Sequence, residues 1–82
     1  MFNGEYRLFT NQQDGYSVLK NSSNIYCYRR SGSDFWHLNT RYTPGDRSAC
    51  AWTSTENGQL PLGSRVWHAS DRGSVVLLVT LL

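Results

Sequence analysis

The chain has 82 residues, 14 charged side chains and a formal net charge of +2. That length allows one small domain, and we expect residues 1–82 to form a single β domain excised from a longer chain. The small net charge argues against a highly basic nucleic-acid arm and against an acidic solvating tail. The 11 aromatic residues are many for so short a chain, which indicates that several rings must be buried for it to fold.

Short runs of β-branched and aromatic residues alternate with turn clusters along the chain, and helical periodicity is missing. Asp14-Gly15 and Asn57-Gly58 are typical of tight hairpins, which require positive φ angles. Strands joined this closely are antiparallel, because a parallel crossover needs about a dozen residues or more. We therefore predict an all-β fold, a small antiparallel barrel or sandwich of six to seven short strands. The expected strands are Glu5–Thr10, Tyr16–Lys20, Ile25–Arg30, Phe35–Thr40, Cys50–Ser54, Ser64–Ala69 and Ser74–Leu81.

Alternation along these strands divides the side chains between two faces of the sheet. His37 and His68 each follow a tryptophan, so they are expected to point outward when the tryptophan points inward. The expected core residues are Tyr6, Leu8, Val18, Ile25 or Tyr26, Trp36, Leu38, Trp52, Val66 or Trp67, and Leu77.

The residues that commonly ligate metals or perform nucleophilic catalysis are few and widely spaced. Cys27, Cys50, His37 and His68 do not show the close pairing of ligands that structural zinc sites have. No local pattern joins a cysteine to a histidine as nucleophile and base. The sequence therefore predicts neither an enzyme nor a metal or cofactor site.

The two cysteines allow one disulfide at most, and a Cys27–Cys50 bridge would contribute about 3 kcal/mol. Two buried free thiols are the alternative, because both residues lie in strand-like stretches. Asn21-Ser22-Ser23 fits the acceptor pattern for N-glycosylation, which is also common by chance. These features slightly favour an extracellular setting and do not assign a compartment.

The apolar segment Val75–Leu82 is much shorter than the roughly 20 residues that span a bilayer as a helix. It is expected to be a buried strand rather than a membrane span. Because both of its faces are apolar, it either lies within the packed structure or covers a surface that meets another copy. The second reading predicts a homo-oligomer formed through Val75–Leu82, which would make the domain a structural subunit of an assembly.

Arginine makes up seven of the eight basic residues, and arginine together with aromatic rings is typical of interface hot spots. The first hypothesis is therefore a binding module that recognises a protein surface or a glycan through polar loops. A single-stranded nucleic-acid binder is a further alternative, because Tyr26 and Tyr28 precede Arg29-Arg30, although the low net charge argues against it. The candidate binding residues are Arg30, Asn39, Tyr42, Asp46, Arg47, Trp52 and Trp67.

The order of several short motifs also resembles a known module. These motifs are Asn3-Gly4-Glu5-Tyr6-Arg7-Leu8, Gly15 with Val18-Leu19-Lys20-Asn21, Ile25-Tyr26-Cys27-Tyr28-Arg29, Trp36-His37-Leu38, and Leu60-Pro61 with Trp67. Together they resemble a short all-β module that recurs, often in tandem, in large multidomain proteins of aquatic invertebrates and protists. The resemblance is detailed over about the first half of the chain. It implies a fold and carries no activity.

Overall fold

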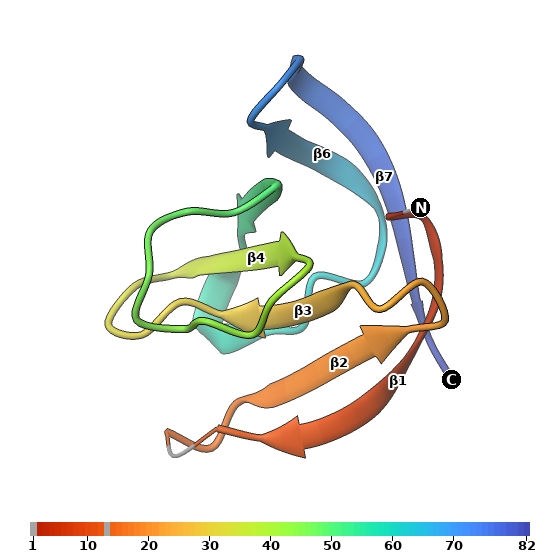
Figure 1. Ribbon diagram of the computed structural model, residues 1–82. Helices are drawn as coiled ribbons and strands as arrows, with labels where there is room; N and C mark the ends of the chain where they lie inside the picture. The colour runs from red at the N-terminus through yellow and green to blue at the C-terminus, as the bar shows by residue number, and fades with distance from the viewer. Residues whose placement is uncertain (1, 13) are drawn as a thin grey trace.

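The computed structural model, drawn as a ribbon in Figure 1, describes residues 2–12 and 14–82. These residues contain seven β-strands and one short 3₁₀ helix. All the strands expected from the sequence are present, and their ends lie within one residue of the expected ends. The strands are β1 (Gly4–Asn11), β2 (Ser17–Asn21), β3 (Tyr26–Arg29), β4 (Phe35–Asn39), β5 (Ala51–Ser54), β6 (Gly63–Ala69) and β7 (Gly73–Leu81), and the 3₁₀ helix is η1 (Glu56–Gly58).

The strands form a closed barrel in chain order, which confirms the predicted fold class. Each strand is antiparallel to the next one along the chain. Because an odd number of alternating strands leaves the first and last pointing the same way, β1 and β7 close the barrel as a parallel pair. The barrel is therefore mixed rather than purely antiparallel. The closure is short and joins Gly4–Tyr6 to Val79–Leu81.

The side chains that point into the barrel form a hydrophobic core around Trp36 and Trp67, which are both fully buried. The sequence left alternatives at two core positions. The structure buries Ile25 rather than Tyr26, and Trp67 rather than Val66. Large rings fill the interior of this small domain, as the aromatic content predicted. The core cluster consists of Tyr6, Leu19, Ile25, Cys27, Trp36, Leu38, Ala51, Trp67, Leu77 and Val79.

Leu8 is the clearest exception to the expected core, since its side chain is 59% exposed. The pairing of β1 with β7 ends at Tyr6, so the rest of β1 continues past the closure of the barrel. A bulge between Leu8 and Thr10 also shifts the register against β2. Alternation identifies the face on which Leu8 lies, but it does not show where the neighbouring strand stops.

Cys27 and Cys50 are both free thiols, so the disulfide considered from the sequence is absent. Cys27 lies on β3 and is buried in the core, whereas the thiol of Cys50 donates to Oδ1 of Asn39 at 3.7 Å. Strand β4 lies between β3 and β5 and separates the two residues. Burial raises the pKa of the Cys27 thiol to about 12, which leaves it protonated and unreactive at neutral pH.

The loop of residues 40–50 forms a second layer over the outer face of β3 and β4. Tyr28 and His37 are paired across these strands, and they belong to the outward-facing set. Both are nevertheless buried. The Tyr28 hydroxyl lies 3.3 Å from Oγ1 of Thr43, and its ring contacts the ring of Tyr42 at 5.3 Å. The long connection between β4 and β5 therefore covers a small cluster outside the barrel.

The side chain of Arg29 packs at one end of the barrel and is only 10% exposed. Its Nε donates to the Ser33 carbonyl at 2.8 Å, and its Nη2 forms an ion pair with Asp34 at 2.9 Å. The guanidinium carbon lies 4.1 Å from the centre of the Tyr16 ring. Gly58 packs directly on this pair, since a Cβ there would lie 2.8 Å from Nη1 of Arg29. These contacts hold the turn after β3 against the end of the barrel.

Candidate binding site

A shallow hollow of about 140 Å³ lies on the outer face of the barrel, beside the loop of residues 40–50. Phe35 and His37 from β4 and Trp52 from β5 line it, because β4 and β5 are neighbours and these positions alternate with core residues. Arg30, just after β3, and Arg47, from the loop, complete the lining. The structure thus brings together three of the residues predicted from the sequence, namely Arg30, Arg47 and Trp52.

Three other predicted binding residues hold the loop in place. Asn39 donates from Nδ2 to the Tyr28 hydroxyl at 3.3 Å and to the Ser48 carbonyl at 3.1 Å. The ring of Tyr42 packs edge-on against Tyr28. The exposed Asp46 accepts a hydrogen bond from the backbone N–H of Ser48 at 3.0 Å, and this bond lowers the pKa of its carboxyl. These contacts fix the position of Arg47 relative to β4 and β5.

The tryptophans of the candidate set lie on opposite faces of the sheet. Trp67 is fully buried in the core, so its ring is not available to a ligand. Trp52 was also expected in the core, but it is half-buried on the outer face and stacks on His68 with ring centres 5.9 Å apart and planes at 22°. His37 is paired with Trp52 on the other side. A row of rings therefore crosses β4, β5 and β6 and ends in the hollow.

The two arginines of the hollow differ from others in the molecule in their charge partners. Among the residues that the structure describes, ion pairs join Arg29 to Asp34 and Arg72 to Asp71. Neither Arg30 nor Arg47 is in an ion pair within those same residues. The hollow therefore places two guanidinium groups over an aromatic floor, with the Asp46 carboxylate close enough to act on His37. Two guanidinium groups beside aromatic rings suit an anionic group with an apolar stem.

His37 is the titratable group that lines the hollow. Its side chain is 3% exposed, and its Nδ1 has no hydrogen-bond partner among the described residues. Burial lowers the pKa of the imidazole from its ordinary value of 6.5, and the nearby Arg30 guanidinium lowers it further, while Asp46 acts in the opposite direction. His37 is therefore neutral at pH 7, and an anion bound beside it would favour its protonated form.

The depressed pKa of His37 predicts a pH-dependent stability. In the unfolded chain His37 takes up a proton near its ordinary pKa of 6.5, whereas the folded protein resists protonation. The unfolded state then binds more protons, so the free energy of unfolding falls as the pH drops below 6.5 and levels off below the folded pKa. Thermal unfolding at a series of pH values from 7 to about 5 should show this fall.

The comparison variants are His37→Gln and His68→Gln. His37→Gln should flatten the dependence of the unfolding temperature on pH, because the titrating group is removed. His68→Gln makes the same substitution at an exposed imidazole, so it controls for the loss of a histidine as such. If the unfolding temperature changed with pH in the same way in the wild type and in His37→Gln, the pH dependence could not be assigned to His37.

No protein-family model, curated protein or solved structure matches this chain. The resemblance noted in the sequence therefore stays a prediction, and the functional proposal rests on the geometry of the hollow. Within residues 2–12 and 14–82, the structure has no helix of the length and apolarity needed to cross a membrane. The same residues include no cluster of three or more His, Cys, Asp or Glu side chains that could hold a metal ion.

The candidates named from the sequence omitted Phe35 and His37, which line the hollow, and His68, which stacks on Trp52 beside it. The available signal was the alternation around Trp36, which places its two neighbours together on the outer face. What alternation lacks is the order of strands around the barrel. Only that order brings β4, β5 and β6 side by side and lines up His37, Trp52 and His68 in one row.

Proposed function

We propose that this domain is a non-enzymatic recognition module whose hollow binds a carboxylate-bearing side chain on the surface of a protein partner. The observation that carries the proposal is the pairing of two arginines without ion-pair partners among the described residues with the half-buried Trp52. Arginine and tryptophan are the residues most enriched at binding hot spots. A guanidinium forms paired hydrogen bonds with a carboxylate, which an ammonium group does not.

The size of the hollow supports a single side chain as the bound group. A volume of about 140 Å³ is below the range of about 300–1,000 Å³ typical of pockets for whole small molecules. Aspartate or glutamate has a short apolar stem, which would lie against Trp52 and Phe35 while the carboxylate meets Arg30 and Arg47. A glycan would use Trp52 in a similar way through its apolar face, and it is the competing ligand class.

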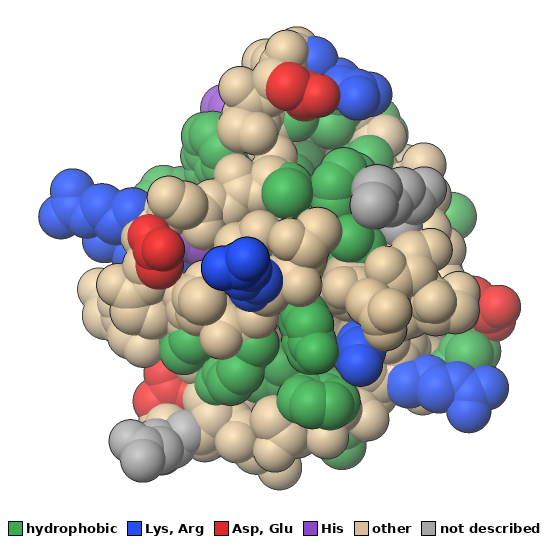
Figure 2. Space-filling model, in the orientation of Figure 1, with side chains coloured by type: hydrophobic (Ala, Val, Ile, Leu, Met, Phe, Trp, Pro, Cys, Tyr) green, Lys and Arg blue, Asp and Glu red, His purple; other side chains and the backbone are tan. Residues whose placement is uncertain are grey.

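The distribution of charge favours a protein over a nucleic acid. Figure 2 shows basic side chains scattered singly over the viewed face, with hydrophobic side chains between them. The net charge is only +2. A nucleic-acid groove needs basic residues in a continuous stripe along the path of the phosphates. Recognition of one carboxylate needs only the local pair that the hollow provides.

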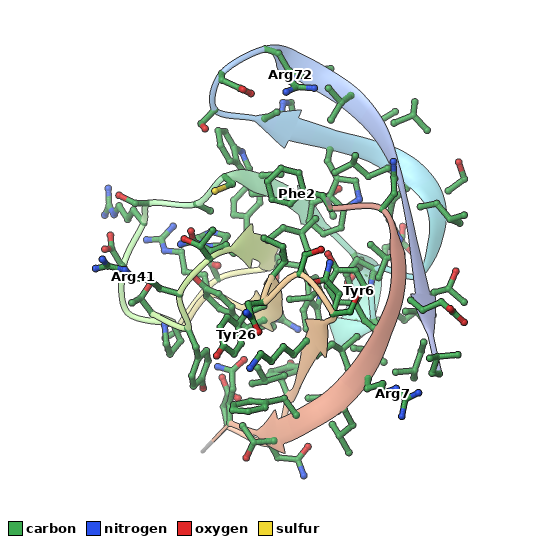
Figure 3. The ribbon with its side chains drawn as sticks, turned by 45° about the vertical axis from the view of Figure 1, so that its right-hand side comes forward. Phe2, Tyr6, Arg7, Tyr26, Arg41 and Arg72 are labelled. Carbon is green, nitrogen blue, oxygen red and sulfur yellow. The ribbon has the colours of Figure 1, made fainter. Side chains whose placement is uncertain are left out.

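The test is a binding titration with labelled peptides in which a single glutamate is flanked by leucine or tryptophan. We expect Arg47→Gln and Arg30→Gln each to weaken binding about tenfold, because each removes a charge-assisted hydrogen bond. The matched control is Arg41→Gln, which makes the same charge change on the same loop, where Arg41 projects outward (Figure 3).

Three outcomes separate the proposal from its competitors. Equal losses in Arg41→Gln and Arg47→Gln would mean that only the overall charge attracts the peptides. Binding that stays the same when the glutamate is replaced by glutamine would also contradict a carboxylate site. The third outcome is binding on a glycan array with no binding of any peptide. If a Trp52→Ala variant lost that glycan binding, the hollow would be a glycan site instead.

A further inference from the structure

Strand β7 has an unpaired edge over roughly half of its length. It pairs with β6 from Gly73 to Val79, but with β1 only at Val79–Leu81. In Figure 1 the β6–β7 hairpin extends well beyond the start of β1. The N–H of Leu78 is taken by Oδ1 of Asn3 at 2.7 Å. The unpaired edge, within the described residues, is therefore Gly73–Leu77.

The direction of the backbone groups along this edge follows from two hydrogen bonds. The N–H of Leu78 donates to Asn3, and the N–H of Leu82 donates to the carbonyl of Tyr6, so both point toward β1. Successive residues of a strand direct their backbone groups to opposite edges. Ser74 and Val76 therefore direct their N–H and C=O groups to the unpaired edge, which lies beyond the start of β1.

The edge lacks the features that usually prevent strands from pairing with other molecules. Residues 73–82 contain no charged side chain and no proline. The unpaired edge of β1 beyond Tyr6 differs, since it carries Arg7 and the bulge near Leu8. Charged residues and bulges are the common means by which proteins protect an edge strand. Protection on β1 and its lack on β7 indicate that the β7 edge is available for pairing.

We infer that Gly73–Leu77 pairs with the same segment of a second copy of this chain, in an antiparallel arrangement around a two-fold axis at Val75. In this register Ser74 faces Val76 of the other copy and Val76 faces its Ser74, so both residues of each copy exchange N–H and C=O bonds with their counterparts. The unpaired segment is symmetric about Val75, and every residue from Gly73 to Leu77 finds a partner. A second copy is the occupant we infer, because it offers the same unused backbone groups at the same spacing and has no charge on this segment to oppose the pairing.

The side chains and the charges agree with this register. Val76 is 65% exposed on the outer face, and in the dimer the two Val76 side chains become diagonal neighbours across the axis. The lack of charge on the segment removes any repulsion between identical strands. Asp71 and Arg72, which pair with each other, lie in the turn between β6 and β7. Figure 3 shows Arg72 at the tip of this hairpin. The contact is short, so the dimer should be weak and reversible rather than obligate.

Sedimentation velocity from the low micromolar to the millimolar range should show a monomer–dimer equilibrium. Val76→Pro removes an N–H that the barrel does not use, and we expect it to weaken dimerisation about tenfold. The control is Val66→Lys, which alters an exposed residue on the same face but one strand away from the edge. It should leave dimerisation unchanged. If two copies packed face to face instead, Val66→Lys would weaken dimerisation more than Val76→Pro does.

A cysteine at the proposed axis gives an independent test, also in the full chain. Opposed residues of a non-hydrogen-bonded pair have Cα atoms about 4.5 Å apart, which is within disulfide range. In a Cys50→Ser background, Val75→Cys should form a covalent dimer under mild oxidation and Val66→Cys should not. A monomer at all concentrations, or equal cross-linking at both positions, would overturn the proposal. If Val76→Pro fails to fold by circular dichroism, the cross-linking comparison decides.

Discussion

Trp36→Ala is expected to lower the free energy of unfolding by about 3–5 kcal/mol, because it deletes the largest type of side chain from the centre of the core. Trp36 is fully buried, its ring meets the Tyr16 ring edge-on with centres 6.0 Å apart, and its Nε1 donates to Oγ1 of Thr55 at 3.0 Å. The cavity left behind would also remove the support of η1. Since small domains are stable by only about 5–15 kcal/mol, a loss of this size is a substantial fraction of the total and should clearly lower the urea midpoint.

The matched control is Phe35→Ala, one residue away on the opposite face of β4. Phe35 is 39% exposed, so its truncation should cost about 1 kcal/mol or less. Urea denaturation followed by circular dichroism measures both variants. Similar losses of unfolding free energy in the two variants would contradict the burial of Trp36 and the exposure of Phe35 on opposite faces of β4. Loss of peptide binding in a folded Phe35→Ala protein would separately support the hollow.

The strands and their faces could be predicted because they depend on local pattern. Alternation placed Tyr6, Trp36, Leu38 and Leu77 in the core, and turn residues marked every strand end. Both features are short-range properties of the chain, so they need no knowledge of tertiary contacts. The parallel closure of β1 with β7 follows from seven alternating strands only when the sheet closes in chain order, and the sequence left barrel and sandwich open.

The site depends on long-range contacts that local pattern does not contain. Tyr28 and Val18 are fully buried although they lie outside the core cluster. For Tyr28 the cover is the loop of residues 40–50, whose Thr43 and Tyr42 contact it. Nothing in the composition of that loop indicates that it folds back over β3 rather than extending into solvent. The same fold-back sets Arg47 beside Arg30.

Buried polar groups were equally beyond prediction from the sequence. Gln12 accepts the backbone N–H of Arg29 through its Oε1 at 3.1 Å, and the Arg29 side chain fills the end of the barrel. A charged residue near a turn is ordinarily expected at the surface. Arg29 is buried because the Ser33 carbonyl, the Asp34 carboxylate and the Tyr16 ring surround its guanidinium. This arrangement exists only after η1 has packed over it.

Gly58→Ala is expected to destabilise the domain by about 2–4 kcal/mol, from backbone strain together with overpacking. Gly58 has a φ of +71°, a conformation that L side chains rarely adopt. A Cβ at this position would lie 2.6 Å from Cε1 of Tyr16 and 2.8 Å from Nη1 of Arg29. Accommodating it requires the Tyr16 ring to separate from the guanidinium, which weakens the packing of Tyr16 and Arg29 at this end of the barrel.

Gly45→Ala is the appropriate control, because a Cβ at Gly45 meets nothing within 4 Å and its φ is not in the left-handed region. It should leave the free energy of unfolding within about 0.5 kcal/mol of the wild type. An Arg29→Met change in the Gly58→Ala background separates the two causes, since it shortens the side chain beneath the new methyl group. Because Arg29→Met itself removes the ion pair with Asp34, the cost of Gly58→Ala in this background is measured against the Arg29→Met single variant. A smaller cost than in the wild type would assign the loss to crowding of Arg29, and an unchanged cost would assign it to the backbone and Tyr16. A Gly58→Ala protein as stable as Gly45→Ala would contradict the packing of η1 over Arg29.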